Sequence, residues 1–147
     1  MPNNICLQVG VKLIIFDLNT QKILTIKRSM KDNMDFKEEY DIPGGRLKLG
    51  EEPLDGLKRE LKEELNYDLA EKPQILDASN IVNDKYRHII RITYGLITDI
   101  NSEKLKLSDE HSKIVFLPFK ENNGFHPLLN KAIVEFENIK GISNESS

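Results

Sequence analysis

The stretch from Gly45 to Tyr67, GRLKLGEEPLDGLKRELKEELNY, constrains the fold of this chain more than any other segment. Its leucines recur at helical spacing, so the sequence predicts an amphipathic helix over residues 53–65 with an apolar stripe of Leu54, Leu57, Leu61 and Leu65. Pro53 suits the first helical position, because its missing N–H is not needed there. Asn66 suits the left-handed position that ends a helix. The apolar stripe is expected to pack on a sheet.

Three carboxylates crowd one turn of this predicted helix, those of Glu60, Glu63 and Glu64. At about 100° per residue, Glu60 and Glu64 fall together beside the leucines, at the seam between helix and sheet. Like charges at these spacings repel, so the cluster costs stability unless a cation lies among it. Oxygen ligands suit Mg²⁺ or Mn²⁺, and the absence of a nearby His or Cys argues against zinc. The alternative is a solvated helix face whose acids are balanced by Lys58, Arg59 and Lys62.

The residues before the helix favour the metal interpretation over the solvated face. Gly44 and Gly45 allow the backbone to approach a ligand closely. Glu51 lies at a spacing that lets it meet Arg59, and this ion pair would hold the preceding loop against the helix.

The rest of the chain predicts a mixed sheet between two helices, an α/β (α+β) sandwich. Strands are expected over residues 6–17, 22–28, 74–82, 86–98 and 112–119, the first two forming a hairpin, with a short strand over 46–49. Residues 29–41 are charged and without clear periodicity, which predicts a long loop. A second amphipathic helix is expected over residues 126–139.

Composition is typical of one globular domain, expected over residues 1–141, with residues 142–147 as a frayed tail. The formal net charge of −3 argues against binding to a nucleic-acid backbone. The single cysteine, Cys6, is expected in the core, and the lack of a possible intrachain disulfide favours a reducing, cytoplasmic location. No apolar run approaches the roughly 18 residues that span a bilayer, and no signal peptide is evident.

The segment that follows Gly45 resembles the Nudix box, G-x5-E-x7-R-E-U-x-E-E-x-G-U with U a bulky aliphatic residue. The match consists of Gly45, Glu51, Arg59, Glu60, Leu61, Glu63 and Glu64. Only the end differs, where Asn66 replaces the glycine that caps the helix and Tyr67 replaces the aliphatic residue. Similar elements fall along most of the chain, namely LTIKRS, IPGG and DEHSKIVFLPF. The chain is therefore identified as resembling the Nudix hydrolases, of the MutT-like kind.

This resemblance implies an α/β/α fold and hydrolysis of a phosphoanhydride in a nucleoside diphosphate linked to another group, with Mg²⁺ or Mn²⁺. It implies that Glu60 and Glu64 bind metal, that Glu63 is a further ligand or the base, and that the Gly44 carbonyl completes the coordination. Gly45, Glu51 and Arg59 would be structural. Glu110 is the best match to a glutamate that acts as base in some members, with His111 as its rival and a plain loop carboxylate as the alternative.

Substrate contacts follow less directly from the resemblance. Arg46, next to the glycine pair, is the first choice for a phosphate contact, and Arg28 and Tyr40 are further candidates, Tyr40 for stacking on a base. The same stacking is open to Phe36, and Lys48, Arg87 and Arg91 are either phosphate contacts or surface charges.

The narrower function is reached by elimination. The proline that marks the ADP-ribose group corresponds to Val82, and the tyrosine that marks the dinucleoside polyphosphate group corresponds to Asp84. We therefore favour a nucleoside triphosphate pyrophosphohydrolase that releases a monophosphate and pyrophosphate. The alternatives are a nucleotide-sugar, ADP-ribose or dinucleoside polyphosphate hydrolase, a non-catalytic nucleotide-binding module, and a fragment of a larger enzyme. A homodimer stays open, because many relatives form one.

Overall fold

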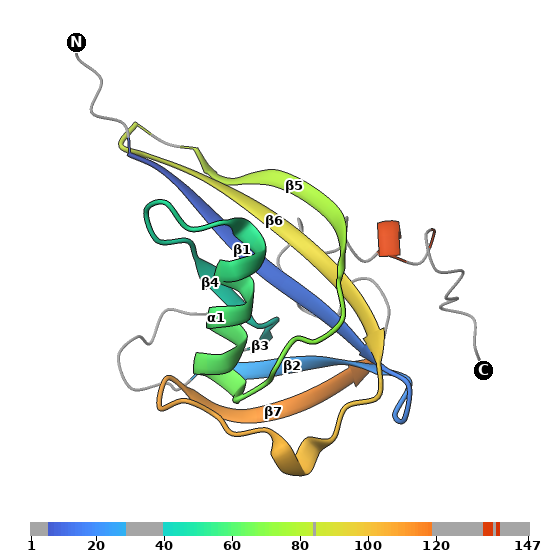
Figure 1. Cartoon of the computed structure of the whole chain (residues 1–147). Coiled ribbons are helices and arrows are strands. Elements are labelled where there is room, and N and C mark those ends of the chain that lie inside the picture. The colour runs from blue at the N-terminus through green and yellow to red at the C-terminus, as the bar shows by residue number, and fades with distance from the viewer. Residues whose placement is uncertain (1–5, 29–39, 84, 119–133, 137, 139–147) are drawn as a thin grey trace.

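The computed structural model describes residues 6–28, 40–83, 85–118, 134–136 and 138 (Figure 1). Its elements follow in the order β1 (Cys6–Asp17), β2 (Lys22–Arg28), β3 (Tyr40–Asp41), β4 (Gly44–Arg46), α1 (Pro53–Leu65), β5 (Gln74–Asn83), β6 (Arg87–Thr98), the 3₁₀ helix η1 (Ser102–Lys104) and β7 (His111–Pro118). The long strands and α1 confirm the predicted elements to within one or two residues. The short strands differ from the prediction, because β3 lies at the end of the expected loop and β4 begins at Gly44 rather than at residue 46.

The strands of this described part form one mixed sheet in the order β3-β2-β1-β6-β5, with β4 also paired to β1 and β7 to β2. The central pair, β1 and β6, is parallel over its whole length, and the other pairs are antiparallel. β1 and β2 pair only at their hairpin end, at Phe16↔Ile23 and Asp17↔Lys22. Nearer its N-terminus, at residues 10–12, β1 pairs instead with β4, which places Gly44 opposite Lys12.

The two faces of the sheet carry separate hydrophobic clusters, as the period of two along a strand requires. Leu13 and Ile15 belong to the cluster under α1, together with the fully buried Leu57, Leu61 and Leu65 of the helix. Ile14 and Phe16 belong to the cluster on the other face, which also contains Phe136. The predicted sheet between helices is confirmed, with α1 on one face (Figure 1) and the helical residues 134–136 at the other. The other residues of the expected second helix lie mainly outside the described residues.

The ends of α1 follow the local sequence. Pro53 takes the first helical position. Asn66 has φ 55° and ψ 35°, the left-handed conformation, and its N–H donates to the carbonyl of Lys62 at 3.0 Å. Asn66 therefore does the work of a C-terminal glycine, because asparagine tolerates this conformation better than most residues.

Cys6 is exposed at the start of β1, so the prediction that it lies in the core is wrong. The residue occupies the end of the strand rather than its buried middle, where the core side chains of β1 lie. Among the described residues, no helix has the length and apolar character needed to cross a membrane.

Candidate functional site

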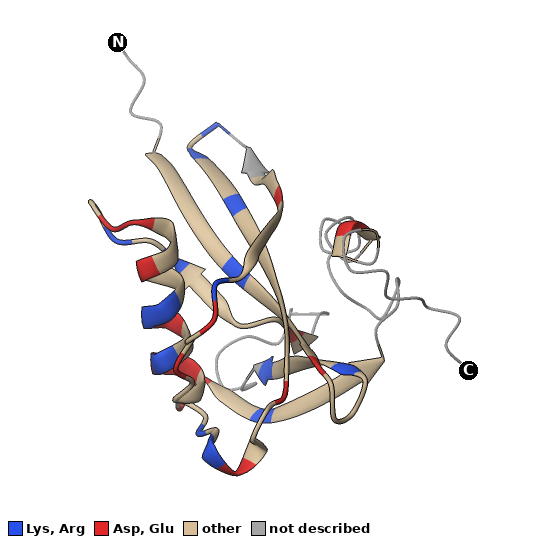
Figure 2. Ribbon diagram, turned by 45° about the vertical axis from the view of Figure 1, so that its right-hand side comes forward, with Lys and Arg blue, Asp and Glu red and all other residues tan. Residues whose placement is uncertain are grey.

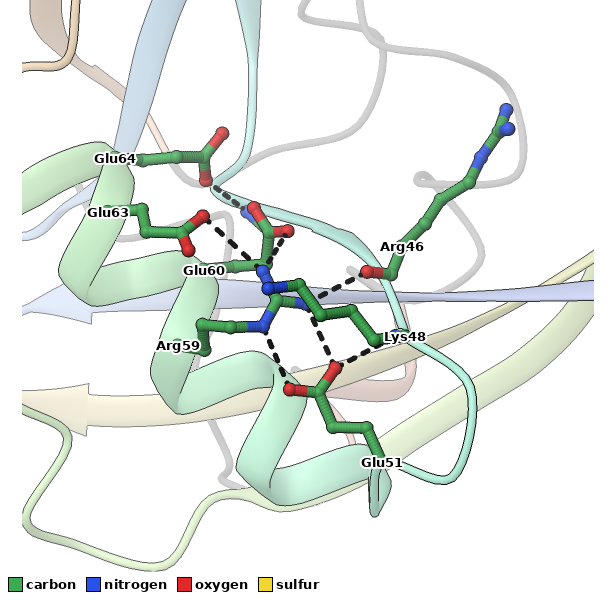
Figure 3. A network of polar contacts seen from close by, with 8 residues as sticks. Arg46, Lys48, Glu51, Arg59, Glu60, Glu63 and Glu64 are labelled. Carbon is green, nitrogen blue, oxygen red and sulfur yellow. Dashed lines mark hydrogen bonds and ion pairs between the residues drawn. The ribbon is translucent and has the colours of Figure 1, made fainter.

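Arg59 and Glu51 form the ion pair that the sequence predicted (Figure 3). Nε of Arg59 donates to Oε2 of Glu51 at 2.8 Å, and Nη2 donates to Oε1 at 2.9 Å, so the pair is bidentate. Nη2 also donates to the carbonyl of Arg46 at 3.0 Å, and the Lys48 N–H donates to Glu51. The hydrogen bonds from Arg59 and Lys48 lower the pKa of Glu51 to about 2. This network ties the loop after β4 to α1.

The other arm of Arg59 lies between two of the three carboxylates on α1. Its Nη1 is 2.9 Å from Oε1 of Glu60 and 3.3 Å from Oε2 of Glu63. Glu60 is largely enclosed, with 16% of its side chain exposed, whereas 56% of the Glu63 side chain is exposed. Acidic and basic residues both lie along α1 (Figure 2), and the Arg59 guanidinium balances part of the charge of Glu60 and Glu63.

Glu64 is the buried member of the cluster and is held by the glycine pair. Its Oε1 accepts a hydrogen bond of 2.7 Å from the Gly44 N–H. Burial raises the pKa of Glu64 to about 7, against the effects of the Gly44 N–H and Lys12, and nearby Glu60 and Asp41 raise it further. This buried carboxylate lacks enough positive charge around it, which a cation would supply.

Gly44 and Gly45 let the backbone contact these carboxylates directly. Gly44 has φ 140°, and a Cβ at this position would collide with the backbone oxygen of Val11. A Cβ on Gly45 would lie 2.5 Å from Oε2 of Glu60. A side chain at position 44 would displace the backbone, and one at position 45 would displace the Glu60 carboxylate, so the observed arrangement depends on both glycines.

The donor chemistry of this cluster fits a hard divalent cation. Glu60, Glu63 and Glu64 offer carboxylate oxygens on one side of α1, where the buried charge of Glu64 is incompletely balanced. Within the part of the chain that the structure describes, no three acidic, His or Cys side chains converge in a metal-binding arrangement. The guanidinium of Arg59 lies between Glu60 and Glu63, and metal binding there would require these carboxylates to turn toward the ion.

The turn before β7 brings His111, rather than Glu110, to the cluster. Glu110 is exposed. Nε2 of His111 lies 3.8 Å from Oε2 of Glu64, and its Nδ1 is 3.3 Å from the Ser108 hydroxyl. The Ser108 N–H also donates to the carbonyl of Glu64 at 3.0 Å, so this turn is fixed to the end of α1. The roles predicted for Glu110 and His111 stay predictions.

The residues predicted to contact substrate lie apart from the carboxylates. The Arg46 side chain points away from them (Figure 3), and its Nη1 donates to Gln8 at 2.6 Å. Tyr40 is half-buried on β3, with the Lys27 ammonium 6.0 Å from its ring centre. The Arg28 side chain and Phe36 are outside the described residues. Arg91 is buried on β6, and Arg87 is exposed.

Sequence reasoning missed Lys12 and Asp41. Nζ of Lys12 is 2.9 Å from Oδ2 of Asp41 and 3.1 Å from the carbonyl of Ile42, two residues before Gly44. A signal for Lys12 was present in the sequence, because Lys12 is the only charged residue in the run from Cys6 to Phe16.

Comparison with known proteins found one matching family profile and many similar structures. The profile of the NUDIX domain matches residues 7–136. The chain is similar to the MutT protein of Methanosarcina mazei Go1, with 19% identity and a TM-score of 0.72, over 97% of this chain and all of that one. A MutT NUDIX hydrolase from Burkholderia pseudomallei matches with 20% identity and a TM-score of 0.68, over 88% and 98% of the two chains. A C. elegans Ap4A hydrolase matches with 17% identity and a TM-score of 0.61, over 88% and 96%. No curated protein sequence matches significantly.

Proposed function

Because the chain belongs to the NUDIX family of pyrophosphohydrolases, we propose that it hydrolyses a phosphoanhydride in a nucleoside diphosphate derivative with the help of Mg²⁺ or Mn²⁺. One observation carries the proposal: the buried Glu64 is hydrogen-bonded to the Gly44 N–H and lies beside Glu60, in the cluster that Arg59 and Glu51 hold in place. A solvated helix face would not bury a carboxylate with so little balancing charge.

Glu60 and Glu64 would hold the metal, with the carbonyl of Gly44 as a further ligand, and Glu63 would be either another ligand or the base. When bound, the divalent ion neutralises the phosphates and lowers the pKa of a water molecule. The protein contributes positioning: the Gly44 N–H orients Glu64, and the Glu51–Arg59 pair holds the preceding loop against α1. Both contacts are already formed in the structure, so Glu64 and the loop before α1 are held in place before substrate binds.

The reaction requires a water molecule to attack one phosphorus while the bond from that phosphorus to the bridging oxygen breaks. The water proton passes to a base, and the leaving phosphate departs with the bridging oxygen. We assign the base to Glu63 first, because its side chain is the most exposed of the three on α1 and is open to water and substrate. Glu110, exposed in the turn before β7, is the second candidate.

For the substrate we propose a nucleoside triphosphate, cleaved to a monophosphate and pyrophosphate. The residues that would mark an ADP-ribose or a dinucleoside polyphosphate hydrolase are absent at Val82 and Asp84. The names of the similar structures include both MutT proteins and an Ap4A hydrolase, so the dinucleoside polyphosphates are the alternative substrate class. We also propose that the chain works without binding nucleic-acid backbones.

A substrate panel with Mg²⁺ tests this proposal. Ordinary and oxidised nucleoside triphosphates, nucleotide sugars, ADP-ribose and dinucleoside polyphosphates are compared for release of phosphate and pyrophosphate. Turnover of a triphosphate with pyrophosphate release supports the substrate assignment, and turnover of only a nucleotide sugar or a dinucleotide contradicts it. Binding of nucleotides without any turnover would instead favour the non-catalytic module.

Two glutamate variants test the site within the same panel. Glu64→Gln should lower turnover by at least about 100-fold, since it removes a charged ligand but keeps the size of the side chain. Glu52→Gln is the matched control, because Glu52 is exposed before α1 and makes no capping hydrogen bond with its side chain. Equal activity of Glu64→Gln and the wild type would refute the assignment of Glu64 as a ligand.

A further inference from the structure

Lys12 is a charged residue in the middle of a buried strand. β1 lies between β2, β4 and β6, and Val11, Leu13 and Ile14 beside Lys12 are fully buried. Only 17% of the Lys12 side chain is exposed. Placing an ammonium group in such surroundings is unfavourable unless it gains strong partners, so the contacts of Lys12 need an explanation.

The hydrogen-bond partners of Lys12 come from the segment that leads into the glycine pair, and its charge also acts on Glu64. Its Nζ donates to Oδ2 of Asp41 at 2.9 Å and to the carbonyl of Ile42 at 3.1 Å. The other carboxylate oxygen of Asp41 accepts the Ile42 N–H at 2.8 Å. Burial opposes ionisation of Asp41, but Lys12 and this N–H leave its pKa below the usual value. Asp41 therefore remains a charged partner for Lys12.

This bridge fixes the backbone just before Gly44. The Leu13 N–H donates to the carbonyl of Pro43 at 2.9 Å, and Lys12 itself pairs with Gly44 across β1 and β4. Two side-chain contacts and the strand pairing thus anchor residues 41–44 on β1. The Gly44 N–H at the end of this segment donates to Glu64 at 2.7 Å.

We propose that Lys12 is a positioning residue for hydrolysis, whose bridge to Asp41 and to the Ile42 carbonyl holds the Gly44 N–H where it orients Glu64. The inference rests on the proposed role of Glu64 as a metal ligand. Groups that hold a ligand in place contribute roughly 10- to 100-fold to activity or metal affinity in other metal sites. The effect of Lys12 is expected in the same range, because Lys12 acts through the backbone that leads to Gly44.

The alternative roles of Lys12 predict different kinetics. A lysine that binds a substrate phosphate would mainly change KM, and one that only stabilises the fold would change stability without a selective change in kcat. Positioning of Glu64 predicts a fall in kcat with little change in KM. It also predicts that the Gly44 amide loses protection against hydrogen exchange when the bridge is removed.

The test compares Lys12→Met, Lys12→Arg and Asp41→Asn in the full chain. Lys12→Met should lower kcat by roughly 10- to 100-fold, with KM nearly unchanged and faster exchange of the Gly44 amide, measured by NMR without metal. Lys12→Arg keeps a donor for Asp41 and should recover most of the activity. The control is Lys62→Met, which removes an exposed ion pair of 3.0 Å between Lys62 on α1 and Asp68 after the helix, and should change neither readout.

The outcomes separate the inference from the function on which it rests. Wild-type kcat in Lys12→Met, a change in KM alone, or unchanged exchange of the Gly44 amide would overturn the inference. If Lys12→Met does not fold, Asp41→Asn decides, because it weakens the bridge without leaving a cavity and should shift kcat and exchange in the same direction. If the wild type turns over no substrate of the panel, the proposed function fails, whereas the exchange measurement still decides whether Lys12 holds Gly44.

Discussion

Replacing Gly45 by alanine should impair the reaction and leave the fold intact. A Cβ at this position would lie 2.5 Å from Cδ and Oε2 of Glu60 and 2.6 Å from Oε1. Ordinary contacts begin at 3.4 Å, so the Glu60 carboxylate has to retreat by about 0.9 Å. The end of a flexible side chain can make this movement, and the backbone of β4 then stays in place.

The size of the effect follows from that displacement. A misplacement of about 1 Å in a catalytic arrangement is enough to lower the rate by roughly 100-fold. The positive φ angles among the described glycines are those of Gly44 and Gly50, so alanine at position 45 meets no backbone strain. The free energy of unfolding should therefore change by less than about 1 kcal/mol.

Two neighbouring glycines provide the comparison. Gly44→Ala combines a φ of 140° with a collision against the Val11 backbone oxygen, and should destabilise the fold by roughly 3 kcal/mol or more. Gly10→Ala is the matched control, because the nearest atom to its Cβ would be the Gly45 carbonyl oxygen at 3.7 Å, an ordinary contact. It should keep both activity and stability.

The assay is kcat for the best substrate of the panel at saturating Mg²⁺, together with urea unfolding of each variant. Wild-type kcat in a folded Gly45→Ala would refute the reasoning, because the position of the Glu60 carboxylate against Gly45 would then be irrelevant to turnover. A Gly45→Ala variant as unstable as Gly44→Ala would refute the claim that the Glu60 side chain moves while the backbone of β4 stays in place.

Three further predictions address stability and the His111 contact. The pKa of Glu51 is lowered from 4.5 to about 2, so the stability that its pair with Arg59 contributes is complete above about pH 4.5 and is lost as the pH falls through 2. Urea unfolding of wild type and Glu51→Gln should show a gap that closes over this range, and a constant gap would contradict the assignment. Leu61→Ala empties a fully buried position and should destabilise by about 2–5 kcal/mol in urea unfolding; a loss below about 1 kcal/mol would mean that α1 packs loosely. His111→Ala should lower turnover by roughly tenfold, whereas His111→Gln, with an amide nitrogen near the position of Nε2, should stay close to wild type. Equal inactivity of both variants would point to proton transfer by His111 rather than support of Glu64.

The local sequence was enough to predict α1 and the Glu51–Arg59 ion pair that holds the preceding loop against it. Leucine spacing, Pro53 and Asn66 predicted where the helix begins and ends, and the structure agrees. The ion pair of Glu51 and Arg59 was also predicted from spacing, because the two residues are only eight positions apart in the sequence. Such features depend on residues within about ten positions of one another. Helix propensity and contacts between nearby side chains therefore decide them.

The strands were predictable where their pattern was strong. The apolar runs of β1 and β6 confirmed the predicted strands, since buried central strands carry a long series of β-branched and aliphatic side chains. The short strands β3 and β4 carry two and three residues, too few for a pattern, and pairing with β2 and β1 creates them. Cys6 was misplaced because the pattern does not reveal where a strand leaves the core.

By itself the sequence determined which family the chain belongs to and which carboxylates gather on one helix face, because both are written within a single short segment. Only the tertiary structure decided that Glu64 is the buried carboxylate, that His111 rather than Glu110 lies beside it, and that Lys12 supports the backbone in front of it. These contacts join α1, β4, β7 and β1, which are far apart along the chain. Their physical cause is the pairing of β1 with β4 and the docking of the turn before β7 on α1, which no local pattern encodes.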